Sequence, residues 1–113
     1  MAPKKNPLKL NRLQLKTLTL LQELARDPQH ATTLENGGVR VGQLPHPHGD
    51  HFHVGAYVAL ASDATGFGNQ AVWVVLERKG LARSAFPLAI ELTPAGLAYD
   101  TGLRHEILHG GHH

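Results

Sequence analysis

A chain of 113 residues, of which 42% are hydrophobic and 18% are charged, has the composition of one globular domain, which excludes an intrinsically disordered chain. It contains no cysteine, which excludes disulfides and thiolate metal sites. No apolar run approaches the roughly 20 residues of a membrane-spanning helix, and lysines interrupt the N-terminal leucines, so we expect a soluble cytoplasmic protein without a signal peptide.

The formal net charge of +2 is unevenly distributed along the chain. Five basic residues precede the first acidic residue, Glu23, and the rest of the chain is mildly acidic. The five are Lys4, Lys5, Lys9, Arg12 and Lys16. Because Pro3 and Pro7 favour extended backbone, we expect residues 1–10 to form a flexible basic arm, which either contacts phosphates or acts as a solubilising tail.

The first predicted element is a helix over residues 12–26. Asn11 is a favourable N-cap, and Gln14 three positions later has the spacing of a capping box. The leucines that follow recur at helical spacing and form an apolar face. Asp27 followed by Pro28 ends the helix, because a residue before proline disfavours the helical conformation.

The next stretch is expected to be a loop over 27–38 and then a half-buried strand over 39–44, where apolar and polar residues alternate. Residues 45–50 contain two prolines and a glycine, which predicts a turn.

Residues 51–61 allow two interpretations. Alternating apolar residues from Phe52 favour a strand to about residue 60, which would pair back onto 39–44 as a His-rich β-hairpin. The alternative is a short strand at 51–54 followed by a helix at 55–61, which would complete a helix-turn-helix.

The second half of the chain begins with a predicted helix that Asn69 caps and Gly80 stops. Two short strands are expected over 81–84 and 88–93. The mixture of helices and hairpins defines an α+β fold class.

A last helix is predicted to open at Thr93 and Pro94, which form an N-cap and first-turn pair. We expect it to run toward His109 with breaks at Gly96 and Gly102.

Two strings in this half, LERKGLAR at 76–83 and IELTPAGL at 90–97, flank a short hairpin. With them, the segment 69–98 resembles the C-terminal half of winged helix-turn-helix domains, including the MarR-like group. The resemblance implies that the first string ends a recognition helix and enters a β-hairpin wing, and that the second leaves the wing and caps the next helix. It implies one winged-helix-like domain over residues 11–109, with a disordered tail at 110–113.

The function that this resemblance implies is nucleic-acid binding or regulation, with DNA or RNA as partner, as in a transcription regulator. N-terminal cations would neutralise phosphates, while polar residues of the recognition helix and wing would approach the DNA. The candidate nucleic-acid-binding residues are Lys4, Lys5, Lys9, Arg12, Asn69, Gln70 and Arg83.

An alternative use of the same scaffold is protein interaction. Trp73 and Val74 are apolar at positions where a base-reading helix would be polar. Together with Phe86 at the wing tip they would form a surface for a protein partner or for self-association. The other interpretation of Trp73 is a core residue packed under the first helix.

The histidines fall mostly into two clusters that contain enzyme-like strings. Residues 46–51 spell H-x-H-x-D-H, as in metallo-β-lactamase-type hydrolases, and residues 105–109 spell the H-E-x-x-H of zinc proteases. Because a chain of this length lacks the remaining ligands and body of those enzymes, we interpret both strings as coincidental and expect no catalytic activity.

Metal binding without catalysis is a separate hypothesis for the first cluster. Strand alternation around the turn would bring histidine pairs together around zinc or another divalent transition metal. The competing interpretation is a polar, exposed hairpin whose imidazoles bind only solvent or neighbouring carbonyls. The candidate ligands are His46, His48, Asp50, His51 and His53.

Overall fold

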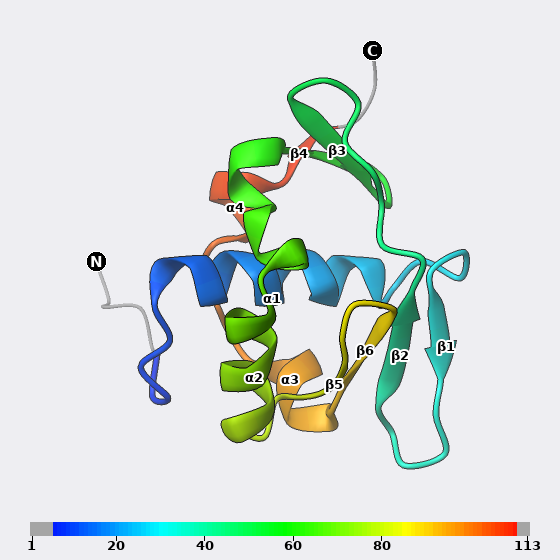
Figure 1. Cartoon of the computed structure of the whole chain (residues 1–113), viewed down its shortest axis with the longest axis vertical. Helices are drawn as coiled ribbons and strands as arrows, with labels where there is room; N and C mark the ends of the chain where they lie inside the picture. Colours follow the sequence, from blue (N-terminus) through cyan, green and yellow to red (C-terminus); the bar gives the residue numbers. More distant parts are fainter. Residues whose placement is uncertain (1–5, 111–113) are drawn as a thin grey trace.

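The computed structural model describes residues 6–110 and confirms the α+β class (Figure 1). Helices and two antiparallel sheets follow one another along the chain, and no helix within the described range is long and apolar enough to cross a membrane. The elements are α1 Arg12–Leu24, β1 Ala31–Thr33, β2 Val39–Gly42, β3 His51–Val54, β4 Tyr57–Leu60, the 3-10 turns η1 Ala61–Asp63 and η2 Thr65–Gly68, α2 Gln70–Arg78, β5 Ala82–Ala85, β6 Ala89–Leu92, α3 Pro94–Ala98, α4 Arg104–Ile107 and β7 His109–Gly110.

Helix α1 is the centre of the molecule. Its predicted capping box is confirmed: the Gln14 backbone N–H donates to Asn11 Oδ1 at 2.8 Å, and the Asn11 N–H donates to Gln14 Oε1 at 2.9 Å. Every side chain from Thr17 to Leu21 is buried, so the helix is covered on all sides rather than on one face. In Figure 1, α2 and α3 lie below it and the β3–β4 hairpin lies above it.

The larger sheet has the strand order β1-β2-β6-β5 and is antiparallel throughout. Val41 and Ile90 face each other in the register and are fully buried, while Arg40 and Glu91 in the next row point away from the core. The prediction that 27–38 is all loop is wrong, because β1 lies within it. That strand buries no apolar side chain and therefore has no alternating pattern.

The smaller sheet has the order β3-β4-β7 and confirms a strand at 51–54 and strand structure to residue 60, but it contradicts the predicted pairing with 39–44. The chain reverses at Gly55, where φ is +59°, so that β3 pairs with β4 and not with 39–44. Strand β2 pairs with β1 and β6 instead. The helix at 55–61 is wrong, and the predicted helix-turn-helix lacks its first helix, since only the 3-10 turns η1 and η2 lie between β4 and α2.

The predicted helix, two-stranded ribbon and helix after Asn69 are present. Asn69 Oδ1 accepts the Ala71 N–H at 3.1 Å, and α2 ends before Gly80, where φ is +78°. Strands β5 and β6 form the ribbon, and Thr93 caps α3 by accepting the N–H of Gly96 at 3.1 Å.

The end of the chain differs from the predicted long helix. Gly96 lies inside α3 and is no break, whereas Gly102, with φ of +72°, separates α3 from α4. Helix α4 ends at Ile107, and the next residues form β7 beside β4. Gly110, expected in a disordered tail, therefore pairs with Tyr57, and residues 111–113 lie outside the described range.

Candidate functional site

The outer face of helix α2 carries polar, charged and apolar side chains. Val72, Trp73 and Leu76 are buried, which directs the opposite side of the helix to solvent. The exposed residues are Gln70, Ala71, Val74, Glu77 and Arg78. Of the two amides predicted to approach DNA, Gln70 is exposed, while the Asn69 side-chain oxygen is occupied by the cap. This face offers few side-chain groups that can read a base edge.

Trp73 is not part of an exposed surface, so the predicted apolar patch of Trp73, Val74 and Phe86 does not form. The indole is 0% exposed, and its Nε1–H donates to the Gly66 carbonyl oxygen at 3.0 Å. Phe86 covers it edge to face, with ring centroids 4.8 Å apart. Val74 is 42% exposed, and Phe86 is half-buried. The core interpretation of Trp73 is the correct one.

Part of the predicted flexible arm is docked against the domain. Leu10 is buried, and Asn6 bonds the Tyr99 hydroxyl at 2.5 Å. Lys79, at the end of α2, donates from Nζ to the Leu8 carbonyl oxygen at 2.8 Å. Residues 6–10 are therefore fixed beside α2, while Lys4 and Lys5 lie outside the described residues.

Three cations are part of this contact or directly follow or precede its residues in the chain, and we call them the basic end, defined as Lys9, Arg78 and Lys79. Lys9 follows the residue that Lys79 binds, and Arg78 is exposed in the last turn of α2. Arg78 and Lys79 were not among the residues predicted to bind nucleic acid. The signal for them was a basic pair at the C-terminal end of the predicted recognition helix, in a chain that begins with a basic, leucine-rich arm.

Two other basic residues near the N-terminus are engaged by acids. Arg12 forms an ion pair with Glu106, and Lys16 Nζ lies 2.7 Å from Asp63 Oδ1. The Lys16 and Asp63 side chains are only 19% and 14% exposed, so this pair ties α1 to η1. The charge of Arg12, which was predicted to bind phosphate, is therefore partly neutralised by Glu106.

The outward face of the larger sheet carries a row of charges. Arg40, Glu91 and Arg83 are cross-strand neighbours on β2, β6 and β5, and Arg40 Nη1 lies 4.0 Å from Glu91 Oε1. Arg83, another predicted DNA contact, is exposed beside this glutamate.

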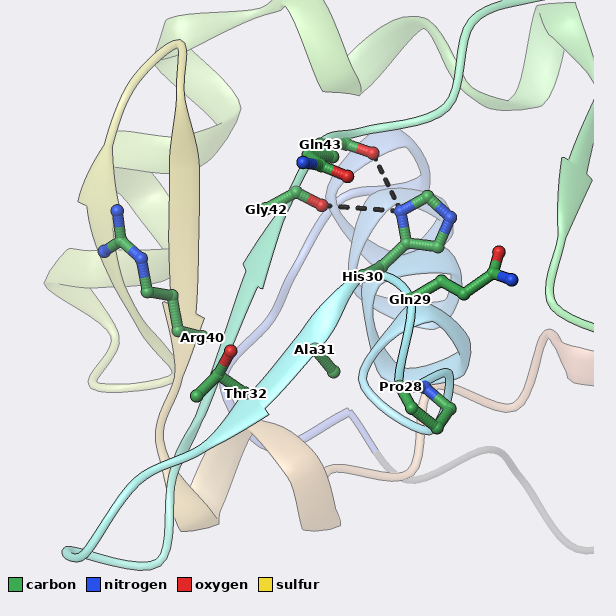
Figure 2. A pocket seen from close by; sticks show the side chains of 8 residues that line it. All are labelled: Pro28, Gln29, His30, Ala31, Thr32, Arg40, Gly42 and Gln43. Atoms are coloured by element: carbon green, nitrogen blue, oxygen red, sulfur yellow. Dashed lines mark hydrogen bonds between the residues drawn. The ribbon is translucent and has the colours of Figure 1, made fainter.

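A polar pocket lies at the C-terminal end of β2, between the loop after α1 and the strands β1 and β2 (Figure 2). His30 Nδ1 is 2.8 Å from the Gln43 carbonyl oxygen, and the Gly42 N–H donates to the His30 carbonyl oxygen at 2.8 Å. These bonds fix the residue after β2, where φ is +51°. Figure 2 shows Arg40 directed away from this histidine, whose Nε2 lies 4.0 Å from Asp27 Oδ2.

The first histidine cluster is only partly assembled as predicted. The rings of His48, His51 and His53 contact one another, with centroid separations of 6.1, 5.0 and 5.1 Å for the pairs 48–51, 48–53 and 51–53. The Asp50 carboxylate is 97% exposed and lies 3.5 Å from His51 Nδ1. His46 lines a separate apolar pocket. Between residues 6 and 110, no group of three or more His, Asp or Glu side chains is arranged to hold a metal ion.

The H-E-x-x-H string does not form a helical metal site. Helix α4 ends at Ile107, so His105 lies on the helix and His109 lies on β7. Glu106 pairs with Arg12 instead of facing a cavity between two histidines.

Comparison with known proteins gives no relative: no family model, no curated protein and no solved structure matches this chain.

Proposed function

We propose that this chain is a winged-helix-like domain that binds nucleic acid through its phosphates at the basic end. The observation that carries the proposal is the 2.8 Å bond from Lys79 to the Leu8 carbonyl oxygen. It joins the N-terminal arm to the helix that precedes the wing-like ribbon. Cations that are distant in the sequence thereby form one positive surface, which is what a phosphate backbone requires.

The arrangement of the elements supports the winged-helix part of the proposal. Helix α2 leads into the β5–β6 ribbon, β2 lies beside β6, and α3 follows the ribbon. The ribbon places Arg83 on an exposed strand, where it can add a further phosphate contact.

The side chains on the outer face of α2 limit how well such a domain can distinguish one base pair from another. Its outer face presents Gln70, Val74 and Arg78, while the Asn69 oxygen is held by the helix cap. One exposed amide gives little discrimination between base pairs, so binding should depend mainly on phosphate contacts and only weakly on sequence.

The test is a fluorescence-anisotropy titration of a labelled short DNA duplex at several salt concentrations. The double variant Lys9→Gln/Lys79→Gln should bind more weakly, and the slope of log K against log salt should fall by about 2, roughly one for each phosphate that is no longer neutralised. Arg26→Gln is the matched control, because Arg26 is a 70% exposed cation near the other end of α1. It should leave both the affinity and the slope unchanged.

Two results would contradict this function. One is the absence of binding to duplex DNA, single-stranded DNA and RNA at low ionic strength. The other is a weakening by Arg26→Gln that is half that of the double variant, which would mean that only net charge matters, because Arg26→Gln removes one charge and the double variant removes two. The Lys79 substitution also removes the bond to Leu8, so circular dichroism of the variant must match that of the unmodified protein.

A second candidate function, self-association through the wing tip, is favoured by one observation. Leu88 is 77% exposed in the turn between β5 and β6. An apolar side chain this exposed at a hairpin tip is a typical anchor for a second protein surface. Leu88→Lys should then lower the weight-average mass that sedimentation equilibrium measures at high protein concentration. Leu60→Lys, which changes a 46% exposed leucine on β4, should leave this mass unchanged. A monomer at every concentration tested would reject self-association.

A further inference from the structure

We propose that His48, His51 and His53, the histidine triad, bind one divalent transition-metal ion of the zinc class, with water in the fourth position. This site is independent of the nucleic-acid function proposed above. It uses three of the five ligands expected from the sequence and assigns a different role to Asp50.

The backbone places all three imidazoles on one side of a hairpin. His48 and His51 are bridge partners, with the His48 N–H donating to the His51 carbonyl oxygen at 2.7 Å. Residues directly opposite each other in an antiparallel pair point to the same face. His53 is two residues beyond His51 on β3 and therefore shares that face.

The turn between the bridge partners is short and well defined. Gly49 and Asp50 form a two-residue loop in which φ is +68° at Gly49. Glycine at the first of two loop positions is the requirement of a type II′ hairpin turn, which fits the twist of the flanking strands. The spacing of His48 and His51 is thus set by the backbone before any ion arrives.

The opposite face of β3 holds the strand in place. Phe52 and Val54 are buried, and the Phe52 ring packs edge to face on Phe67 at 5.8 Å between centroids. Since this anchor fixes the Cβ positions of His51 and His53, binding an ion requires no folding of the hairpin.

Two of the three ring separations match those of a metal-bound set, and the separation of His48 and His51 must shorten on binding. With metal–nitrogen bonds of about 2.0–2.1 Å and tetrahedral angles, three imidazole centroids lie about 5.2 Å from one another. The observed separations are 5.0, 5.1 and 6.1 Å. The proposed site requires the imidazoles to turn their ring nitrogens toward one ion, and rotation about the side-chain bonds does this without moving the backbone.

Asp50 supplies an orienting partner. Its carboxylate lies 3.5 Å from Nδ1 of His51. A carboxylate that accepts the Nδ1–H fixes the tautomer of a ligating histidine and leaves Nε2 for the metal. We therefore place Asp50 outside the coordination sphere.

The donor chemistry selects the ion. Three neutral imidazoles with no thiolate and no directly bound carboxylate suit zinc, nickel and copper, whereas magnesium and calcium require oxygen ligands. Because of this preference, titration of the same protein with Mg²⁺ serves as a negative control.

The experiment is calorimetric titration of the full chain with Zn²⁺, together with visible absorption on adding Co²⁺. We expect one equivalent to bind at the triad, tetrahedral cobalt bands, and no response to Mg²⁺. His48→Ala, His51→Ala and His53→Ala should each weaken zinc binding by about 100-fold or more, since removal of a mere orienting partner already costs about 10–100-fold. Asp50→Asn should fall within that smaller range.

Two controls locate the site. His105→Ala removes an exposed histidine of α4 and should leave zinc binding unchanged. A His112→Ala/His113→Ala variant tests the histidines at the chain end and should retain one equivalent. Because each variant keeps the hairpin turn and the buried face of β3, its metal-free melting temperature should match that of the unmodified chain.

The proposal is overturned by any of three results. These are no zinc binding at micromolar concentration, binding that survives all three triad substitutions, and loss of binding only in the His112→Ala/His113→Ala variant. Octahedral cobalt spectra would likewise reject a three-imidazole tetrahedral site.

Discussion

The sharpest test of the core is the substitution Trp73→Phe. The change keeps an aromatic ring against Phe86 but removes the indole N–H that donates to the Gly66 carbonyl oxygen. Leaving that carbonyl unpaired in a buried site costs about 1–3 kcal/mol. The smaller ring leaves roughly 40 Å³ empty, which adds about 1 kcal/mol. We expect a loss of about 2–4 kcal/mol in the free energy of unfolding.

Urea unfolding followed by far-ultraviolet circular dichroism measures this loss, because the variant has no tryptophan for fluorescence. Val74→Ala is the matched control on the next residue of α2, and a 42% exposed side chain there should change stability by less than about 0.5 kcal/mol. If Trp73→Phe costs no more than this control, the indole is on the surface and our assignment of the core is wrong. A changed m-value would instead indicate an altered denatured state.

Three further substitutions test the packing of the remaining elements by the same measurement. Gly96→Ala would drive a Cβ into the Leu81 carbonyl oxygen and should cost about 3 kcal/mol, while a change below about 1 kcal/mol would mean that α3 lies elsewhere. Gly80→Ala meets no atom within 4 Å but needs a φ of +78°, so it should cost only about 1 kcal/mol. Glu23→Gln removes the partner 2.8 Å from Arg104 Nη1 and should cost about 1–2 kcal/mol, because the carboxylate is 9% exposed and the guanidinium 38%. Hydrogen bonding to Glu23 raises the pKa of Arg104 further above neutrality, so the arginine stays charged and its contribution to stability does not fade between about pH 6 and 9.

The parts of the fold that the sequence predicts are those fixed by local chemistry. Asn11 and Gln14 define the start of α1 because the capping box is made by residues three apart. Asn69, Gly80 and Thr93 likewise mark the ends of α2 and the start of α3, since caps and left-handed stops depend only on nearby atoms.

The β3–β4 hairpin shows why the central region was not predicted correctly. The buried face carries Phe52 and Val54 on β3 but Tyr57 and Ala59 on β4, so the two-residue reversal at Gly55 moves the alternation by one position. The sequence alone contains an apolar residue at nearly every position there, and either phase fits it. The choice depends on what the hairpin packs against, which is tertiary information.

For the candidate sites too, the sequence predicts which residues are available, while the tertiary structure decides which of them meet. The histidine positions can be read from the sequence, but which three meet is decided by the turn at Gly49, so the predicted ligand His46 lies apart from the triad. The basic end could not be predicted, because it depends on the arm docking through Lys79 and Leu8, 71 residues apart. Whether Trp73 is a core residue or a surface residue depends on which face of α2 is buried, and the sequence alone does not specify that face.

The positions of the two proposed sites predict that they act independently. Figure 1 places the β3–β4 hairpin and the C-terminal end of α2 on opposite sides of α1, whose residues from Thr17 to Leu21 are all buried. Coupling between them would need an element with two packings, and a helix enclosed in this way has no free space for a second one. Saturating zinc should therefore leave DNA affinity unchanged within about twofold, and His51→Ala should not alter the salt slope. A zinc-dependent change of about tenfold, reciprocated by a DNA-dependent change in zinc affinity, would refute independence and make the histidine triad a regulator of the basic end.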